Sequence, residues 1–193
     1  MSDEKTDSRV IYPVRTVGDH RQYLLLKRVP DRGAFWQGVT GGVENGESLL
    51  EAARRELIEE TGLSFSVIND IDYSYSFPIE NRWQHNYAVD VKEIVEHVFV
   101  ASLDYEQEPV IDPDEHDAWK WCFFDEAIKL LTWPENIEAL QKSDRYLNRA
   151  RHWEKMLRNY YTLVDWDPET GVPLPETLEN LGLGHLVDDL NNI

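Results

Sequence analysis

The stretch from Gly41 to Leu63, GGVENGESLLEAARRELIEETGL, decides the architecture of this chain, because it joins a glycine-rich loop to a strongly patterned helix. Ser48 followed three residues later by Glu51 is the pattern of a capping box, and Gly62 suits a left-handed helix terminator. Apolar residues between these two signals recur on one side of the helix. The sequence therefore predicts a helix over Leu49–Thr61 that directly follows the loop.

Three glutamates of this predicted helix fall within one acidic sector. At about 100° per residue, Glu56, Glu59 and Glu60 lie at relative angles of about 0, 300 and 40°. Such clustering is unfavourable, since like charges four residues apart cost about 0.2–0.5 kcal/mol. Glu59 and Glu60 also lie near the C-terminal end of the helix, which already carries a partial negative charge. Two interpretations stay open on this pattern alone: a carboxylate metal site, or a solvated acidic face that Arg55 partly neutralises by pairing with Glu51 or Glu59.

The composition favours a single domain, and its net charge restricts which ligands it can bind. With 193 residues, of which 41% are hydrophobic, the chain is long enough for one compact domain with a short appendage. Its 19 Lys and Arg against 37 Asp and Glu give a formal net charge of −18, which opposes binding of bulk nucleic acid or an anionic membrane. An anionic substrate would need a divalent cation and a few local basic residues, so the charge balance itself points to a metal.

The cellular location is inferred from the cysteine usage and the N-terminus. Cys122 is the single cysteine, and its apolar surroundings, WKWCFF, predict a buried and inert thiol. The first residues lack the basic and apolar regions of a signal peptide, and no apolar run reaches the ~20 residues that a membrane span requires. We expect a cytoplasmic protein without a membrane partner.

The order of the remaining predicted elements is that of an α/β domain. Residues 1–8 are polar and expected to be disordered. Strands are predicted over residues 10–15, 23–28, 35–40, 65–68, 71–77, 94–103 and 118–124. Helices are predicted over residues 125–131, from residue 134 to 141, and from residue 143 to about 163. Loops are expected over residues 29–34, 80–90 and 104–117.

The opening stretch also fits a longer pattern: glycine, five residues, glutamate, seven residues, then Arg-Glu-apolar-x-Glu-Glu-x-Gly-apolar. The matching residues are Gly41, Glu47, Arg55, Glu56, Leu57, Glu59, Glu60, Gly62 and Leu63. This pattern resembles the Nudix box of the Nudix hydrolases without a mismatch. Because so many positions are restricted, the signal is far more specific than a lone glycine motif.

The resemblance implies a fold, a cofactor and a reaction. The fold is a Nudix-type α/β/α sandwich with a mixed sheet, covering residues 9–142 and followed by a C-terminal helical extension over residues 143–193. The reaction is hydrolysis of a pyrophosphate bond in a nucleoside diphosphate linked to another group X, with Mg²⁺ or Mn²⁺. By position, Glu56, Glu59 and Glu60 match the metal-binding glutamates, and Arg55 matches the arginine that orients them. Oxygen ligands of this kind are also what Mg²⁺ chemistry requires.

The acid that accepts a proton during the reaction varies in the family, so the sequence leaves alternatives. Glu115 precedes the WKWCFF strand, where relatives often carry a further catalytic or metal-binding glutamate. Glu47 or a glutamate of the box is the alternative. The predicted catalytic set is Glu56, Arg55, Glu59 and Glu115.

Predicted substrate contacts surround the box; they are Gly41, Gly42, Lys27, Arg28, Trp36 and Arg82. The glycines would let the backbone approach a phosphate, and the basic residues would offset the acidic surroundings. The tryptophan would stack on a base or a pterin. For each of them a structural role stays open: a tight turn, a surface charge or core packing.

The substrate is predicted from weaker similarity outside the box. The segments FWQGVTGGVENGE and EHDAWKWCFFDEAIKLLTWPENIEAL are similar to bacterial dihydroneopterin triphosphate and nucleoside triphosphate pyrophosphatases. A nucleoside or pterin triphosphate is therefore expected, with nucleotide sugars and dinucleoside polyphosphates as alternatives. A catalytically silent nucleotide-binding module is the alternative of a different class. The extension would form a homodimer, cover the site as a lid or extend the core, and the sequence does not choose between these roles.

Overall fold

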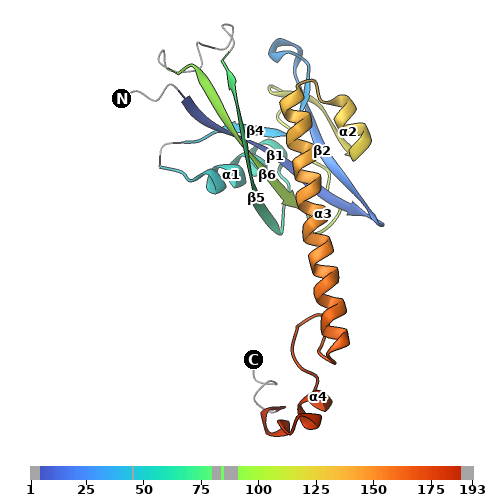
Figure 1. The fold of residues 1–193 in the computed structure, drawn as a ribbon. Helices are drawn as coiled ribbons and strands as arrows, with labels where there is room; N and C mark the ends of the chain where they lie inside the picture. The colour runs from blue at the N-terminus through green and yellow to red at the C-terminus, as the bar shows by residue number, and fades with distance from the viewer. Residues whose placement is uncertain (1–4, 45, 80–83, 85–90, 188–193) are drawn as a thin grey trace. The chain divides into compact units, whose positions relative to one another are not determined.

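A seven-stranded mixed sheet forms the centre of the first of two compact units. The computed structural model describes residues 5–44, 46–79, 84 and 91–187, and the two units comprise residues 1–144 and 145–193. The strand order is β3-β2-β1-β6-β5, with β4 paired to β1 and β7 paired to β2. Figure 1 labels β1, β2, β4, β5 and β6 of this sheet. Strands β1 and β6 run parallel, whereas β2, β4 and β5 each run antiparallel to their neighbours. The predicted mixed α/β fold class is confirmed.

The strands of the sheet are β1 (Lys5–Val17), β2 (His20–Arg28), β3 (Trp36–Gln37), β4 (Val39–Gly42), β5 (Val67–Pro78), β6 (Glu93–Ser102) and β7 (His116–Phe123). The helices are α1 (Leu49–Thr61), α2 (Phe124–Leu130), α3 (Pro134–Leu163) and α4 (Pro175–Asn180), with short 3₁₀ turns η1 (Pro30–Arg32) and η3 (Gly184–Leu186). None of the helices in the described ranges has the length and apolar character needed to cross a membrane.

Helix α1 has the bounds that its capping signals predict. The side chain of Ser48 accepts from the backbone N–H of Glu51, and the Glu51 carboxylate accepts in return from the backbone N–H of Ser48. Gly62 ends the helix in the left-handed conformation, at φ 63°. The predicted capping box and terminator are both confirmed, and together they fix where the acidic face of the helix begins and ends.

The two faces of the sheet are covered by different helices. On one face, Ala53 and Leu57 of α1 pack with core residues of β1 and β6 such as Ile11 and Phe99. On the other face, Tyr12 donates through its hydroxyl to the carbonyl of Asn136 at 2.9 Å, near the beginning of α3. Because successive strand residues point to opposite faces, the sheet lies between α1 and the first turns of α3, as in a sandwich.

Residues 5–8 differ from the expected disorder, because the structure places them in β1. They pair in parallel with β6, beginning at Lys5 opposite Glu93. Ser8 also pairs with Gly42 of β4, and its hydroxyl donates to the carbonyl of Gly41 at 3.0 Å. A polar segment can thus be ordered by backbone pairing with a neighbouring strand, which composition does not reveal.

Residues 134–163 form one helix rather than the two predicted segments. Ser143 stands where the second segment was expected to begin, yet it is buried within α3 and its hydroxyl donates to the carbonyl of Ala139 at 2.9 Å. No proline or glycine interrupts the sequence at that point. The predicted break is therefore wrong, and the part of α3 up to Asp144 belongs to the first unit.

Two strand boundaries also differ from expectation. The predicted strand over residues 35–40 is divided into β3 and β4 at Gly38, where a β-carbon would come within 2.8 Å of the carbonyl oxygen of Ile11. The predicted strands over residues 65–68 and 71–77 merge into β5. A bulge shifts the register against β6 between Asp70 and Ser74, and Asp72 within it has φ 55°. The carboxylate of Asp70 accepts from the backbone N–H of Asp72 at 2.8 Å, which stabilises the bulge.

Candidate active site

Arg55 of α1 joins the glycine-rich loop to the acidic face of the helix. Its Nε and Nη2 donate to the two carboxylate oxygens of Glu47, each at 3.0 Å. Its Nη1 donates to Glu56 at 2.9 Å and to Glu59 at 3.0 Å, and Nη2 also donates to the carbonyl of Gly42 at 3.1 Å. The hydrogen bonds with Glu47 raise the pKa of Arg55 and lower that of Glu47. One guanidinium therefore fixes three carboxylates.

The carboxylate of Glu56 lies against the backbone of β4 at Gly41. A β-carbon at residue 41 would stand 1.9 Å from the carboxyl carbon of Glu56, so glycine leaves the space that this carboxylate occupies. Burial raises the pKa of Glu56, and the hydrogen bond from Arg55 opposes the rise. Gly41 was predicted to admit a phosphate, but its observed effect is to make room for a glutamate.

Glu60 lies beside β4 and is largely covered, with its side chain 12% exposed. The backbone N–H of Thr40 donates to this carboxylate, yet its Oε2 has no hydrogen-bond partner among the described residues. Burial raises the pKa of Glu60 to about 8; the charge of Arg28 opposes this rise, and Glu56 and Glu115 add to it. A buried carboxylate oxygen without a donor is suited to contact a cation.

Glu115 lies among basic residues beside Glu60. Its Oε2 accepts from Nη1 of Arg28 at 2.8 Å, and its Oε1 lies 3.2 Å from Nη1 of Arg32. Nε2 of His116 is 3.4 Å from Nη1 of Arg28 and 4.0 Å from Oε2 of Glu60. Burial lowers the pKa of His116 to about 4, so the imidazole is neutral at pH 7. The structure thus brings the predicted residues Arg28 and Glu115 close to the box.

The acidic residues fit a divalent cation by their chemistry. Glu56 and Glu60 present largely buried carboxylates, and oxygen ligands are those that Mg²⁺ prefers. Glu59 is 58% exposed and held by Arg55. Within the described ranges, no three His, Cys, Asp or Glu side chains already converge as a metal-binding group. The assignment of the three box glutamates as ligands therefore stays a prediction.

The structure separates the two basic residues predicted to contact the substrate. Arg28 shares the face of β2 with Leu26, which packs in the core beneath α1, whereas Lys27 points to the opposite face. Lys27 pairs there with Asp117 at 3.1 Å. Trp36 stands opposite Lys27 in the pairing of β2 with β3 and is half-buried.

Two further predicted contacts have different outcomes. A β-carbon at Gly42 would meet nothing within 4 Å, so the surrounding packing does not require glycine there. Arg82 lies outside the described residues, as does the predicted loop over residues 80–90 apart from Gln84.

Two buried residues beside the glutamates are not singled out by the sequence patterns. Arg9 of β1 is fully buried and stands opposite Gly41 in the pairing with β4. His116 begins β7 and is also buried. Arg9 could have been found from its spacing to Ile11, because residues two apart in a strand share one face. A charged residue on the core-facing side of an apolar strand is costly unless it has a partner or a function. His116 follows an acidic loop and carries no comparable signal.

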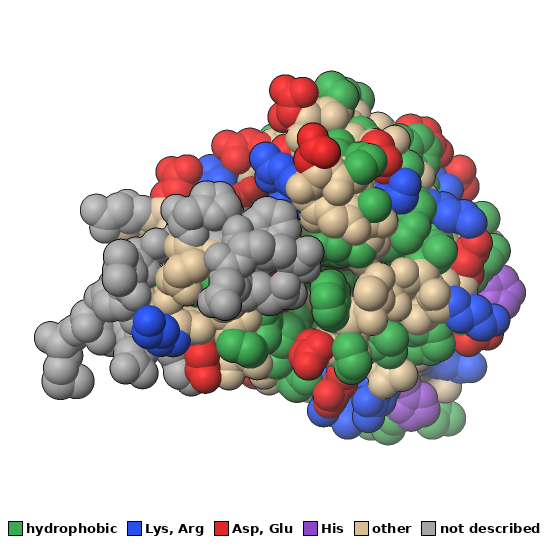
Figure 2. Space-filling model, turned by 90° about the horizontal axis from the view of Figure 1, so that it is seen from above, with side chains coloured by type: hydrophobic (Ala, Val, Ile, Leu, Met, Phe, Trp, Pro, Cys, Tyr) green, Lys and Arg blue, Asp and Glu red, His purple; other side chains and the backbone are tan. Residues whose placement is uncertain are grey.

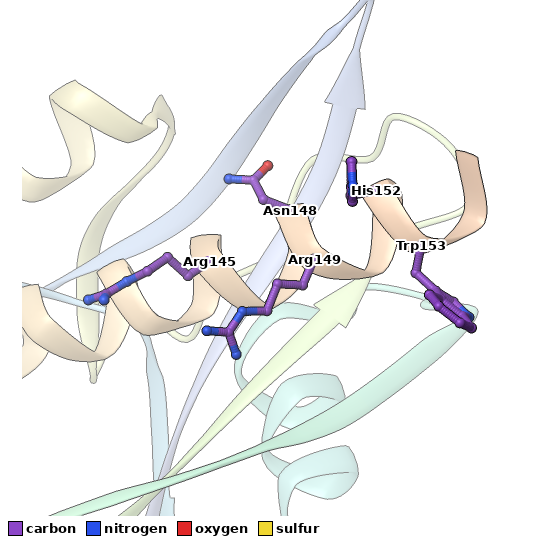
Figure 3. A pocket seen from close by; sticks show the side chains of 5 residues that line it. All are labelled: Arg145, Asn148, Arg149, His152 and Trp153. Carbon is purple, nitrogen blue, oxygen red and sulfur yellow. The ribbon is translucent and has the colours of Figure 1, made fainter. Parts of the chain in front are cut away.

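A hollow of about 390 Å³ lies along α3 in the second unit; it is lined by Arg145, Asn148, Arg149, His152 and Trp153 (Figure 3). None of these residues belongs to the predicted site, and all five project from the same helix. On the face seen in Figure 2, acidic and basic side chains are interspersed over the described surface. The candidate active site is therefore defined by the contacts of the box glutamates and not by this hollow.

Comparisons with known proteins agree with this geometry. A family model described as the NUDIX domain matches residues 7–143. The dihydroneopterin triphosphate diphosphatase of Haemophilus influenzae is 31% identical over 146 residues, which cover 74% of this chain and 90% of the relative. The solved structure of the E. coli dihydroneopterin triphosphate pyrophosphohydrolase is similar with a TM-score of 0.61 and 30% identity, covering 70% of this chain and 92% of that chain.

One similar protein is named for an activity other than pyrophosphate hydrolysis. An octanoyltransferase of Myxococcus xanthus is 32% identical over 139 residues, which cover 68% of this chain. The chain spans 37% of the length of that relative, so the match concerns part of it.

The sandwich fold and the box-centred site define the class of a Nudix hydrolase. The chain belongs to the Nudix family, since the NUDIX domain model covers more than half of its residues. The predicted enzyme class, a Nudix pyrophosphohydrolase, is confirmed by this family and by the named relatives. Nudix hydrolases act on small nucleotide-like substrates and generally use divalent metal ions.

Proposed function

We propose that the chain hydrolyses a pyrophosphate bond of a nucleoside or pterin triphosphate, with Mg²⁺ or Mn²⁺ held by Glu56, Glu59 and Glu60. The observation that carries this proposal is the buried Oε2 of Glu60, which has no donor among the described residues and lies beside Arg28 and Glu115. The name of the 31% identical relative supports a pterin triphosphate as the first substrate to test.

Arg55 serves this reaction by positioning the carboxylates. Its bidentate contact with Glu47 ties the loop to α1, and its Nη1 holds Glu56 and Glu59. When bound, the metal neutralises phosphate oxygens and makes a coordinated water more acidic. Arg55 contributes by limiting the reorganisation that the carboxylates undergo when they bind a cation.

Arg28 is the basic residue best placed to contact a phosphate. It reaches the acidic residues from the core-facing side of β2, and its Nη1 already contacts the Glu115 carboxylate. A phosphate oxygen is chemically similar to that carboxylate oxygen, so the guanidinium can bind either. Lys27, which pairs with Asp117, is assigned no role in the site.

Glu115 is our candidate for the proton acceptor. Its charge contributes to the raised pKa of Glu60, which supports a role for Glu115 beside this proposed metal ligand. Both oxygens of Glu47, the alternative acceptor, are engaged by the single guanidinium of Arg55, and its pKa is lowered. The contact with Arg55 therefore makes Glu47 a weak base. The cytoplasmic location stays a prediction, and a homodimer stays one of the open roles of the C-terminal extension.

The test is a substrate panel with Mg²⁺, with release of phosphate and pyrophosphate as the readout. The panel contains dihydroneopterin triphosphate, the common nucleoside triphosphates, a nucleotide sugar and a dinucleoside tetraphosphate. We expect pyrophosphate release from a triphosphate, and loss of that activity in Glu60→Gln. Turnover of the nucleotide sugar or the dinucleoside compound alone would move the substrate to that class. Binding of Mg²⁺ and nucleotide without turnover of any compound would favour a silent module.

A further inference from the structure

Arg9 is a buried cation for which the described part of the protein supplies no hydrogen-bond acceptor. Its side chain is 0% exposed, and Nε, Nη1 and Nη2 all lack a partner among the described residues. Five N–H groups of a guanidinium seldom remain unsatisfied in a folded protein, because an unpaired buried charge is costly. The residue therefore needs an acceptor that these residues do not provide.

Strand pairing places Arg9 directly beside the candidate active site. It stands opposite Gly41, the residue whose missing side chain makes room for the Glu56 carboxylate. The charges that act on its guanidinium are those of Glu56, Arg55, Glu47 and Asp7. The unsatisfied donors thus lie next to the residues proposed to hold the metal.

The neighbouring carboxylates are engaged elsewhere. Both oxygens of Glu47 accept from Arg55, and Glu56 accepts from Nη1 of the same residue. Asp7 lies 3.1 Å from Nε2 of His97 through its Oδ1. The acidic neighbours act on Arg9 through their charge, but no hydrogen bond joins them to it among the described residues.

We propose that Arg9 binds a phosphoryl oxygen of the ligand in the active site, as a substrate-contacting residue in addition to Arg28. The proposal rests on the proposed function for the identity of the ligand and deepens it by naming the contact. A phosphoryl group offers several anionic oxygens, which match the planar array of guanidinium donors. Since the guanidinium is covered in this structure, the contact requires the Glu56 carboxylate or the loop beside it to shift as the ligand binds.

A second role would produce the same burial but a different phenotype. Arg9 could act through Glu56 alone, by stabilising its negative charge from beneath. In that case removal of the Arg9 side chain would lower kcat and leave the affinity for pyrophosphate unchanged, with or without a metal ion. Buried water would be the third source of acceptors, and removal of Arg9 would then alter neither quantity. The Kd for pyrophosphate and the kcat of the variant together separate these cases.

The experiment measures binding of inorganic pyrophosphate by titration calorimetry in the presence of Mg²⁺, using the full chain and the variant Arg9→Met. Methionine keeps the apolar stem and removes the donors. We expect the Kd for pyrophosphate to rise by about 10- to 100-fold, as for the loss of hydrogen bonds to a charged group. Arg54→Met is the matched control, because Arg54 neighbours the site residues on α1 but is exposed. Its Kd should match that of the wild type.

A parallel measurement of KM and kcat for the best triphosphate completes the test. We expect Arg9→Met to raise KM more than it lowers kcat. An unchanged Kd with a lowered kcat would overturn the proposal in favour of a positioning role, and no change in either quantity would overturn it in favour of buried water. Failure of the wild type to bind pyrophosphate would overturn it as well.

Folding and function are controlled separately. If Arg9→Met does not fold, as judged by circular dichroism and thermal unfolding, Arg9→Lys replaces it. Lysine keeps one positive charge but loses the planar donors, so its Kd should still rise, by a smaller factor. An unchanged Kd in a folded Arg9→Lys would contradict the proposal. Pyrophosphate binding does not depend on turnover, so the two proposals can fail separately. If Arg9→Met raises the Kd for pyrophosphate but the wild type cleaves no triphosphate, the proposed function is refuted and the phosphate contact of Arg9 is retained.

Discussion

The carboxyl carbon of Glu56 lies 1.9 Å from the point where a β-carbon at residue 41 would stand. A side chain at residue 41 and the Glu56 carboxylate in its observed position therefore cannot both be accommodated. Gly41 belongs to β4 and Glu56 to α1, and their contact sets how closely the helix carboxylate approaches the sheet. The glycine at the start of the box is thus explained by the packing of a side chain from the helix. This relation makes position 41 a sensitive test of the site.

Gly41→Ala should therefore displace the Glu56 carboxylate. A misplacement of about 1 Å in a catalytic group costs on the order of 100-fold in rate, so we expect a loss of that size in kcat/KM. Steady-state kinetics on the triphosphate substrate give the value, and thermal unfolding reports whether the fold persists. Gly42→Ala is the matched control, because its β-carbon would meet nothing within 4 Å. Equal losses in both variants would refute the steric explanation.

Removal of the charge at Glu115 tests its assignment as proton acceptor. Glu115→Gln keeps the shape of the side chain, so contacts with Arg28 and Arg32 can persist in part. General-base catalysis contributes about 10²- to 10⁴-fold, and we expect kcat to fall within that range while KM changes little. Asp114→Asn, in the same loop, should leave kcat near the wild-type value. A reduction of less than about threefold in Glu115→Gln would shift the role to Glu47 or a box glutamate.

Magnesium should stabilise the folded protein through Glu60. A ligand at 100 times its Kd stabilises the folded state by about 2.7 kcal/mol, which raises Tm by several degrees in a chain of this size. We expect such a rise on addition of Mg²⁺ and its reversal by a chelator. In Glu60→Gln the buried oxygen without a donor is lost as an anionic ligand, so the Mg²⁺-dependent rise should disappear. A rise of equal size in that variant would show that the ion binds elsewhere.

The stability of the protein should depend on pH through Glu96, a buried residue of β6. Its carboxylate accepts from the hydroxyl of Tyr75, which itself accepts from Asn136 at 2.8 Å. Burial raises the pKa of Glu96 from 4.5 to about 7, and the hydrogen bond from Tyr75 opposes the rise. Between these two values the folded protein retains a proton that the unfolded chain releases. The free energy of unfolding therefore falls as the pH rises from about 4.5 to 7.

Glu96→Gln should remove this dependence, because the amide does not ionise. Relative to the variant, the wild type should lose on the order of 3 kcal/mol of stability across that pH window. Urea unfolding at pH 5, 6, 7 and 8 provides the comparison. Parallel pH profiles for the two proteins would show that Glu96 does not titrate in this range.

The sequence predicted the part of the structure that is specified locally. The bounds of α1 depend on Ser48, Glu51 and Gly62, which act within a few residues of each other along the chain. The acidic sector follows from helix periodicity, and the order of strands and helices follows from patterning. These signals predicted where the box would lie, whereas the convergence of its three glutamates on a metal stays a prediction.

Features that depend on distant partners were not predicted. The ordering of residues 5–8 depends on pairing with β6 and, at Ser8, also with β4, and the burial of Arg9 depends on its pairing opposite Gly41. The neighbourhood of His116 and Glu60 joins residues far apart in sequence, at 4.0 Å. In each case a neighbouring element, and not the local composition, decides the outcome.

The bulge at Asp72 has a consequence for how the protein behaves at high concentration. Strand β5 stands at the end of the strand order, and the edge of a sheet can template pairing with a second molecule. Its 12 residues would otherwise form a long regular ladder, but the left-handed Asp72 and the register shift beside it break that ladder. A ladder between two copies of β5 would be interrupted at this bulge, which disfavours edge-to-edge pairing along the whole strand.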